Sequence, residues 1–127
     1  KRNVSAQKFV RNPKVKKLKE MYNYECQINE CDFKLEYNKK KGEKSFLIHV
    51  HHYRPLEYGG HDDFDNMIVL CPNHHNEFDF KTKFISRDGT TIIDKRGKEN
   101  NETIKFHRNH KLEITNIESL LELSNEI

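Results

Sequence analysis

Six of the chain's eight histidines lie within residues 49–79, HVHHYRPLEYGGHDDFDNMIVLCPNHHNEFD. Two adjacent pairs, His51-His52 and His74-His75, are separated by a paired glycine and an apolar run. Imidazole is the usual ligand for zinc and similar metals, and the usual general base near neutral pH. The pattern therefore predicts a metal or catalytic site folded from the two ends of this segment.

The hydrophobic core is expected to be thin. Of the 127 residues, 34% are hydrophobic and 34% are charged, which suits one domain of the kind often stabilised by a metal or disulfides. Three cysteines cannot all pair within one chain, and the sequence shows neither a signal peptide nor an apolar run of membrane-spanning length. We therefore expect a reduced, soluble, cytoplasmic protein whose cysteines bind metal. Because the first residue is Lys, we also expect a fragment of a longer chain or a processed protein.

Positive charge is concentrated at the N-terminal end. Residues 1–19 carry eight basic side chains and no acidic one, so that, with a net charge of +3 for the whole chain, the remainder has a net charge of −5. A basic arm on an acidic body favours contact with a polyanion, nucleic acid first. A solvated helix face joined to a linker is the alternative that this pattern leaves open.

Secondary structure can be predicted along most of the chain. Residues 1–11 are expected to be an arm or linker. Asn12 followed by Pro13 predicts a helix start, and the spacing of apolar residues extends this amphipathic helix over 12–24. Further on, the patterns predict a polar loop (38–44), a strand (45–52), a long loop (53–66), a strand (67–70), a helix (71–80), a hairpin turning at Asp88-Gly89 (83–94), a short strand (103–107) and a terminal helix beginning near Thr115.

The cysteines predict a first metal site. Cys26-x4-Cys31 and Cys71-x2-His74 together supply four ligands, the number that a closed tetrahedral zinc site needs. The alternative is three buried free cysteines acting as small hydrophobic residues. It is disfavoured because all three fall beside the histidine cluster, and structural zinc is the stronger interpretation.

The remaining histidines predict a second site. His75 follows His74 directly and is rotated by about 100° around a helix, so it is poorly placed for the same ion. It shares a helix face with Asp79, four residues on. The strand ending in His51-His52 is the expected partner of that face, with a metal held between strand and helix.

The segment VHHYRPLEYGGHDDFDNMIVLCPNHHNEFD resembles the core of the HNH endonuclease family, in its zinc-containing branch with a ββα-metal fold. The resemblance covers about residues 12–80 and is carried by His51, His52, Pro55, Gly59, Gly60, Asn66, Cys71, His74 and His75. It implies an α+β domain over 12–127, with a motif core at 24–80. An N-terminal helix would precede that core, and a C-terminal β-hairpin plus helix would form a packing extension over 81–127.

The resemblance also implies roles for single residues. His51 and His75 would bind a catalytic divalent metal such as Mg²⁺, Mn²⁺ or Ni²⁺, with Asp79 where relatives often have a histidine. His52 would be the general base that activates water. Asn66 would hold the loop and orient the base or contact the metal. Since successive strand residues point to opposite faces, His51 and His52 can reach one site only if the strand ends or twists there.

The chemistry of these residues fits phosphodiester hydrolysis, with imidazole accepting a proton and a metal neutralising charge on phosphate. Arg54 is a candidate phosphate contact, with a surface arginine as the alternative, and Lys14 and Lys17 are candidate nucleic-acid contacts. His49 is expected at most to support His51. We expect His61 to be a bystander and His107 and His110 to be surface or packing residues.

The expected function is a metal-dependent DNA endonuclease domain, of a restriction or mobile-element system. Two alternatives stay open at this point: a zinc-stabilised nucleic-acid-binding module that does not cleave, and a structural zinc domain that mediates protein contacts. Retention of His52 together with its predicted metal ligands disfavours both alternatives.

Overall fold

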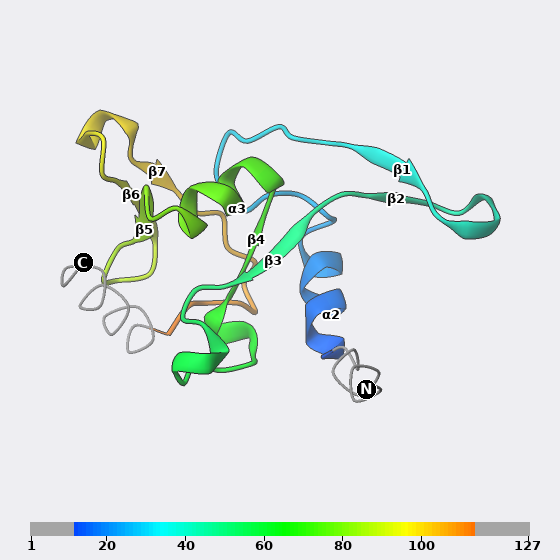
Figure 1. Cartoon of the computed structure of the whole chain (residues 1–127), viewed down its shortest axis with the longest axis horizontal. Helices are drawn as coiled ribbons and strands as arrows, with labels where there is room; N and C mark the ends of the chain where they lie inside the picture. The colour runs from blue at the N-terminus through cyan, green and yellow to red at the C-terminus, as the bar shows by residue number, and fades with distance from the viewer. Residues whose placement is uncertain (1–11, 114–127) are drawn as a thin grey trace, which may run out of the picture.

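The computed structural model describes residues 12–113. This range contains two α-helices and seven short strands, and the strands form three small antiparallel sheets (Figure 1). The predicted basic arm (1–11) and terminal helix near Thr115 lie outside the described residues. No helix in the described part of the chain is long and apolar enough to cross a membrane.

The first described helix, α2 (Pro13–Met21), begins as predicted. The Asn12 side chain accepts a hydrogen bond from the Lys14 amide, and Pro13 occupies the first turn. Leu18 is fully buried on the inner face. The helix ends before the predicted residue 24 because Asn23 and Tyr24 adopt left-handed backbone conformations, with φ of 54° and 58°.

The centre of the domain is a ββα unit. Strand β3 (His49–His52) pairs antiparallel with β4 (Met67–Leu70), with His51 opposite Ile68 and His52 opposite Met67. Helix α3 (Pro72–Asp79) follows β4 directly. All four residues of β4 are completely buried, so β4 anchors the histidine-bearing strand to the core.

The strand predicted over 45–52 is wrong as a single element. It is divided into β2 (Lys44–Phe46) and β3, and β2 pairs with β1 (Glu36–Asn38) in a hairpin that extends from the body of the domain (Figure 1). The predicted loop over 38–44 contains the tip of this hairpin, with a short 3-10 turn at Lys40–Gly42, but its first and last residues, Asn38 and Lys44, belong to β1 and β2. The polar residues of 36–44 carry no alternation of apolar and polar side chains, which is the signal that identifies a strand.

The predicted hairpin after α3 is confirmed. It consists of β5 (Lys83–Ile85) and β6 (Thr91–Asp94), with φ of 77° at Gly89 in its turn. A third strand, β7 (Glu102–Thr103), pairs with β6. The strand predicted over 103–107 is therefore shorter and begins one residue earlier, and the residue after it, Ile104, forms an isolated bridge with Ile28, between Cys26 and Cys31.

One buried amide joins these layers. Gln27 is completely buried, accepts a hydrogen bond from the Val69 amide with its side-chain oxygen, and donates one to the Lys105 carbonyl. The core around it is built from aliphatic side chains of all layers: Leu18, Ile28, Met67, Ile68, Leu70, Ile85 and Ile92. The turn after α2, strand β4 and the C-terminal segment thus share one core.

His110 closes the domain near the end of the described chain. Its Nε2 lies 2.8 Å from the Phe64 carbonyl and its Nδ1 lies 2.6 Å from the Tyr22 hydroxyl. The carbonyl can only accept, so Nε2 carries the proton and Nδ1 accepts from the tyrosine. His110 is buried, which lowers its pKa. It is a packing histidine, one of the two roles that were predicted for it.

We predict that His110 makes the domain less stable in mild acid. Because burial favours the neutral form, the unfolded state binds the proton more readily, so stability is lost as pH falls below the ordinary histidine value of about 6.5. The loss is at most about 1.4 kcal/mol per pH unit. Urea denaturation at pH 7 and pH 5.5 should show a smaller pH dependence for His110→Gln than for the control His61→Gln, whose side chain is exposed. Equal pH dependence in both variants would contradict this assignment.

Candidate active site and metal centre

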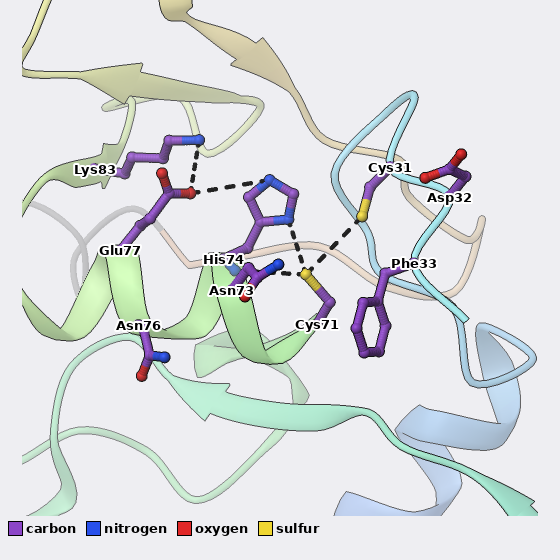
Figure 2. Close-up of a pocket in the computed structure, with 9 residues that line it drawn as sticks. All are labelled: Cys31, Asp32, Phe33, Cys71, Asn73, His74, Asn76, Glu77 and Lys83. Carbon is purple, nitrogen blue, oxygen red and sulfur yellow. Dashed lines mark hydrogen bonds and ion pairs between the residues drawn. The ribbon is translucent and has the colours of Figure 1, made fainter. Parts of the chain in front are cut away.

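Three cysteines and one histidine gather where the turn after α2 meets the start of α3. Cys71 caps α3 and its sulfur accepts the backbone N–H of His74, which places His74 in the first turn beside it. Cys26 and Cys31 come from the preceding turn, where the Cys31 amide donates to the Ile28 carbonyl. The four predicted ligands are therefore brought together, with one ligand atom of each within 4.8 Å of the others. Figure 2 shows three of them, Cys31, Cys71 and His74.

The spacing of these atoms fits a tetrahedral ion. Zinc bonds of about 2.3 Å to sulfur and about 2.0 Å to nitrogen place two sulfurs about 3.8 Å apart, and sulfur and nitrogen about 3.5 Å apart. His74 Nδ1 lies 3.5 Å from the Cys26 sulfur and 3.2 Å from the Cys71 sulfur. The sulfurs of Cys31 and Cys71 are 4.0 Å apart. This Cys3His cluster is compatible with structural zinc.

The protonation pattern of the cluster suits a cation. A hydrogen bond from Cys26, followed by contacts with His74, lowers the pKa of Cys71 to about 3. The same hydrogen bond and, to a smaller extent, burial raise the pKa of Cys26. Burial also raises the pKa of Cys31. One thiolate is thus stabilised among three sulfurs, and a bound metal would favour deprotonation of the other two.

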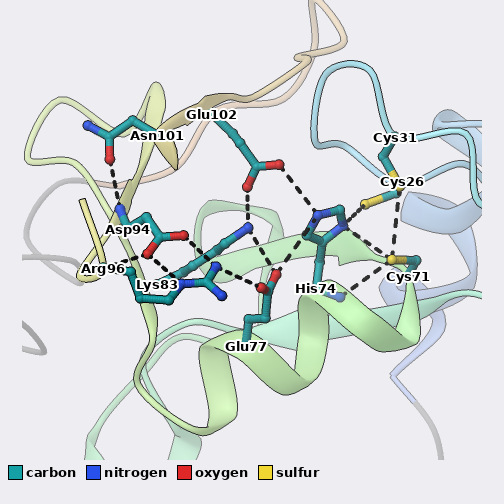
Figure 3. Close-up of polar contacts among 10 residues, drawn as sticks. All are labelled: Cys26, Cys31, Cys71, His74, Glu77, Lys83, Asp94, Arg96, Asn101 and Glu102. Carbon is teal, nitrogen blue, oxygen red and sulfur yellow. Dashed lines mark hydrogen bonds and ion pairs between the residues drawn. The ribbon is translucent and has the colours of Figure 1, made fainter. Parts of the chain in front are cut away.

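A charged network lies behind His74 (Figure 3). Its Nε2 is 3.6 Å from a carboxylate oxygen of Glu102 and 4.0 Å from one of Glu77. The buried Lys83 ammonium contacts both carboxylates, at 2.9 Å for Glu77. Such partners hold a ligating imidazole in one orientation with its other nitrogen toward the metal. A pocket of about 500 Å³ beside this network is lined by Cys31, Cys71, His74, Glu77 and Lys83, among others (Figure 2).

A second cluster forms between β3 and α3. His51, His75 and Asp79 each offer one ligand atom, and these atoms lie within 4.8 Å of one another. The Asp79 carboxylate is 3.8 Å from His51 Nδ1 and 3.6 Å from His75 Nε2. His75 and Asp79 share a face of α3, and β3 supplies the opposing histidine, so the three predicted ligands are brought together.

His51 is held in its neutral form. Its ring stacks on Phe78 with centroids 5.6 Å apart, and burial, followed by the charge of His75, lowers its pKa to about 3. A neutral imidazole has the lone pair that a metal ligand needs. His49, on the same side of β3, places its Nδ1 2.9 Å from Nδ1 of His75. This contact can hold the His75 ring with Nε2 toward Asp79. His49 was expected to support His51, but its hydrogen-bond contact is with His75.

His52 is not among the three clustered residues. Its Nε2 lies 2.8 Å from the Asp62 carboxylate, in the long loop. A hydrogen bond from Asn12 and, to a smaller extent, one from His52 lower the pKa of Asp62. The carboxylate therefore accepts, Nε2 carries the proton, and Nδ1 keeps its lone pair. Sequence reasoning missed Asp62, although its position in the loop just after His61 lies within the motif.

Asn66 holds the loop between the two strands. Its side chain is 1% exposed, accepts the Arg54 amide, and donates to the carbonyls of Arg54 and His61. Gly60 allows this closure, because a Cβ there would lie 2.0 Å from the Arg54 carbonyl oxygen. The paired glycine of the motif thus has a packing reason.

The predicted nucleic-acid contacts differ in their surroundings. Arg54 Nε donates to the Tyr58 carbonyl, and Lys14 forms an ion pair of 2.7 Å with Asp63. Lys17 is exposed on α2. Of the remaining histidines, His61 pairs with Asp65 at 2.8 Å. The partners of His74 were also not predicted from the sequence, because Glu102 and Lys83 come from the C-terminal sheet and no motif links them to the cluster.

Comparison with known proteins agrees with this geometry. Residues 26–78 match the model of the family described as HNH endonuclease. The chain carries an HNH endonuclease domain. Both clusters of possible metal ligands draw on this segment, except that Asp79 lies one residue beyond it. The predicted family and the mixed α and β fold are confirmed.

Two relatives of the HNH domain are restriction enzymes. Over 33 residues, 26% of this chain, it is 48% identical to the type IV methyl-directed restriction enzyme EcoKMcrA of Escherichia coli (strain K12), and this covers 12% of that enzyme. The modification dependent TagI restriction endonuclease has a similar structure, with a TM-score of 0.69 and 25% identity. That match covers 87% of this chain and 37% of TagI. The chain thus spans well under half the length of either relative.

We predict that Asn66→Ala destabilises the HNH domain by about 2–3 kcal/mol, because three hydrogen bonds worth about 1 kcal/mol each are lost and buried backbone groups are left without partners. The free energy of unfolding in urea measures this loss. Asn76→Ala is the matched control, because that asparagine is exposed on α3, and it should change stability by less than about 0.5 kcal/mol. Equal effects of the two substitutions would contradict the role of Asn66 in the loop.

Proposed function

We propose that this HNH domain is a metal-dependent DNA endonuclease that hydrolyses phosphodiester bonds, as the nuclease part of a restriction-type protein. The observation that carries the proposal is the cluster of His51, His75 and Asp79, followed along β3 by His52, whose Nε2 is held by the Asp62 carboxylate. The names of both relatives describe restriction enzymes directed by modification, which supports DNA as the substrate. The proposed domain spans 12–127, with its motif core at 24–80.

His52 is the proposed general base. With Nε2–H donated to Asp62, its Nδ1 lone pair can accept a proton from water. The water oxygen then forms a bond to phosphorus, and one bridging P–O bond breaks. Asp62 stabilises the imidazolium that results, much as a carboxylate does behind other catalytic histidines.

His51, His75 and Asp79 are the proposed ligands of one divalent ion, such as Mg²⁺, Mn²⁺ or Ni²⁺. When bound, such an ion would neutralise charge on the scissile phosphate and on the departing oxygen. Three protein ligands leave coordination positions for phosphate and water. Asn66 holds Arg54 and the loop that follows His52, and so keeps the base in place.

The Cys3His cluster is the proposed site of a structural zinc. We predict about one tightly bound zinc per chain by elemental analysis, because four protein ligands close the coordination shell. Cys71→Ser should give unfolded or aggregated protein, since binding energy at such a site is largely folding energy. Asn73→Ser, exposed in the same helical turn, should fold and keep its zinc. A well-folded wild-type sample without zinc would refute the assignment.

His52→Ala should separate binding from cleavage. Loss of the base should slow plasmid nicking by about 10²–10⁴-fold, while zinc content and DNA binding are kept. His51→Ala should instead raise the Mn²⁺ concentration needed for half-maximal nicking, because a ligand is lost. His61→Ala is the control, because the side chain of that histidine is exposed in the loop after His52 and pairs with Asp65.

Nicking assays with Mg²⁺, Mn²⁺ and Ni²⁺ in turn provide the measurement. A His52→Ala variant that nicks at the wild-type rate would show that the base is assigned to the wrong residue. A wild-type protein that binds DNA and nicks it with none of the three ions would favour a binding module over a nuclease.

A further inference from the structure

A groove of about 470 Å³ runs between α2 and the β1–β2 hairpin, apart from the Cys3His cluster and its charged network. On the α2 side it is lined by Lys16 and Lys19, which lie one turn apart on one face of the helix. On the hairpin side it is lined by Tyr37 and Lys39. Figure 1 shows the hairpin reaching outward from the end of the domain that carries α2.

The charge of the groove points to an anionic occupant. Among the described residues that line it, three are lysines and none is an aspartate or glutamate. The pocket beside the Cys3His cluster differs, since its lining includes Asp32 and Glu77. Three lysines around one groove attract a chain of phosphates.

Aromatic side chains in the groove point to nucleobases. Tyr37 and Ser45 are opposite each other across the hairpin, so they share its face toward the groove. Tyr37 is 43% exposed although it is large and apolar, and Tyr24 also lines the groove. Grooves that combine lysines with exposed aromatic rings bind single nucleic-acid strands, with phosphates on the cations and bases stacked on the rings.

The groove leads to the proposed catalytic cluster. His49 forms part of its lining, and His49 Nδ1 lies 2.9 Å from Nδ1 of His75, one of the three clustered ligands. A strand in the groove would therefore continue beside His75 and His51. The groove, with a volume of about 470 Å³, has room for one sugar–phosphate unit with its base turned toward Tyr37.

We propose that this groove binds a single DNA strand leading to the cleavage site, with phosphates on Lys16, Lys19 and Lys39 and a base stacked on Tyr37. The inference rests on the proposed DNA substrate and adds the path by which the strand reaches the metal cluster. It also assigns a function to the β1–β2 hairpin, whose three β1 residues are all exposed.

The test compares two double variants of equal net charge. Lys16→Glu with Lys39→Glu reverses two groove lysines, whereas Lys40→Glu with Lys44→Glu reverses two exposed lysines of the same hairpin that do not line the groove. Binding of a fluorescein-labelled 20-nucleotide single strand is measured by anisotropy at several salt concentrations. No magnesium, manganese or nickel is added, so that the strand stays intact.

The groove variant should bind the single strand at least tenfold more weakly than the control variant. Its log–log salt dependence should be flatter by about 1.4, because about 0.7 is lost for each of two phosphate contacts on a single strand. Tyr37→Ala should weaken binding about tenfold, the effect of removing one stacking ring. Phe80→Ala is its control, since Phe80 is 79% exposed and outside the groove.

Equal weakening of DNA binding by the two double variants would overturn the proposal. Poly-glutamate that competes for the groove as well as DNA of equal charge would also overturn it, because that result would indicate an acidic protein partner. Plasmid nicking separates this test from that of the nuclease. Nicking by the wild type with equal binding by both double variants refutes the groove alone. Groove-specific loss of binding without nicking refutes the nuclease and keeps the groove.

Discussion

The contact between His74 Nδ1 and the sulfurs of Cys26 and Cys71 joins the parts of this domain that its apolar core holds only weakly. The turn after α2, the start of α3 and, through Glu102, strand β7 all meet there. The core takes four residues from β4 but only one or two from each of these parts, such as Ile28, Phe78 and Ile104. A metal at this point would add stability where burial of apolar surface supplies little.

The same contact determines the orientation of the second cluster, which consists of His51, His75 and Asp79. His74 and His75 are successive residues of a helix, so their side chains leave the axis about 100° apart. Once His74 faces the cysteines, His75 and Asp79 are turned toward β3, where His51 stands opposite buried Ile68. The Cys3His cluster therefore orients the proposed catalytic ligands as well as stabilising the fold.

How much was predictable from sequence depends on the distance along the chain between partners. Cys71 with His74 and Asn12 with Pro13 are local patterns with known geometry, and both were predicted with their positions. The partners Glu102 and Asp62 come from a separate sheet and from a polar loop, where no periodicity marks them. The β1–β2 hairpin was missed because its strands are short and polar, so that no alternation distinguishes them from a loop.

The two clusters differ in the way that structural and catalytic metal sites differ. Around His74, four residues would complete a tetrahedral shell around an ion, and charged partners sit behind the imidazole. Around His51, only three ligands gather, and the side chain of Asp79 is 52% exposed. Substrate oxygens can approach on that exposed side, while the neutral, stacked His51 limits movement on the other. A phosphate would therefore approach the proposed metal ligands from the side of Asp79.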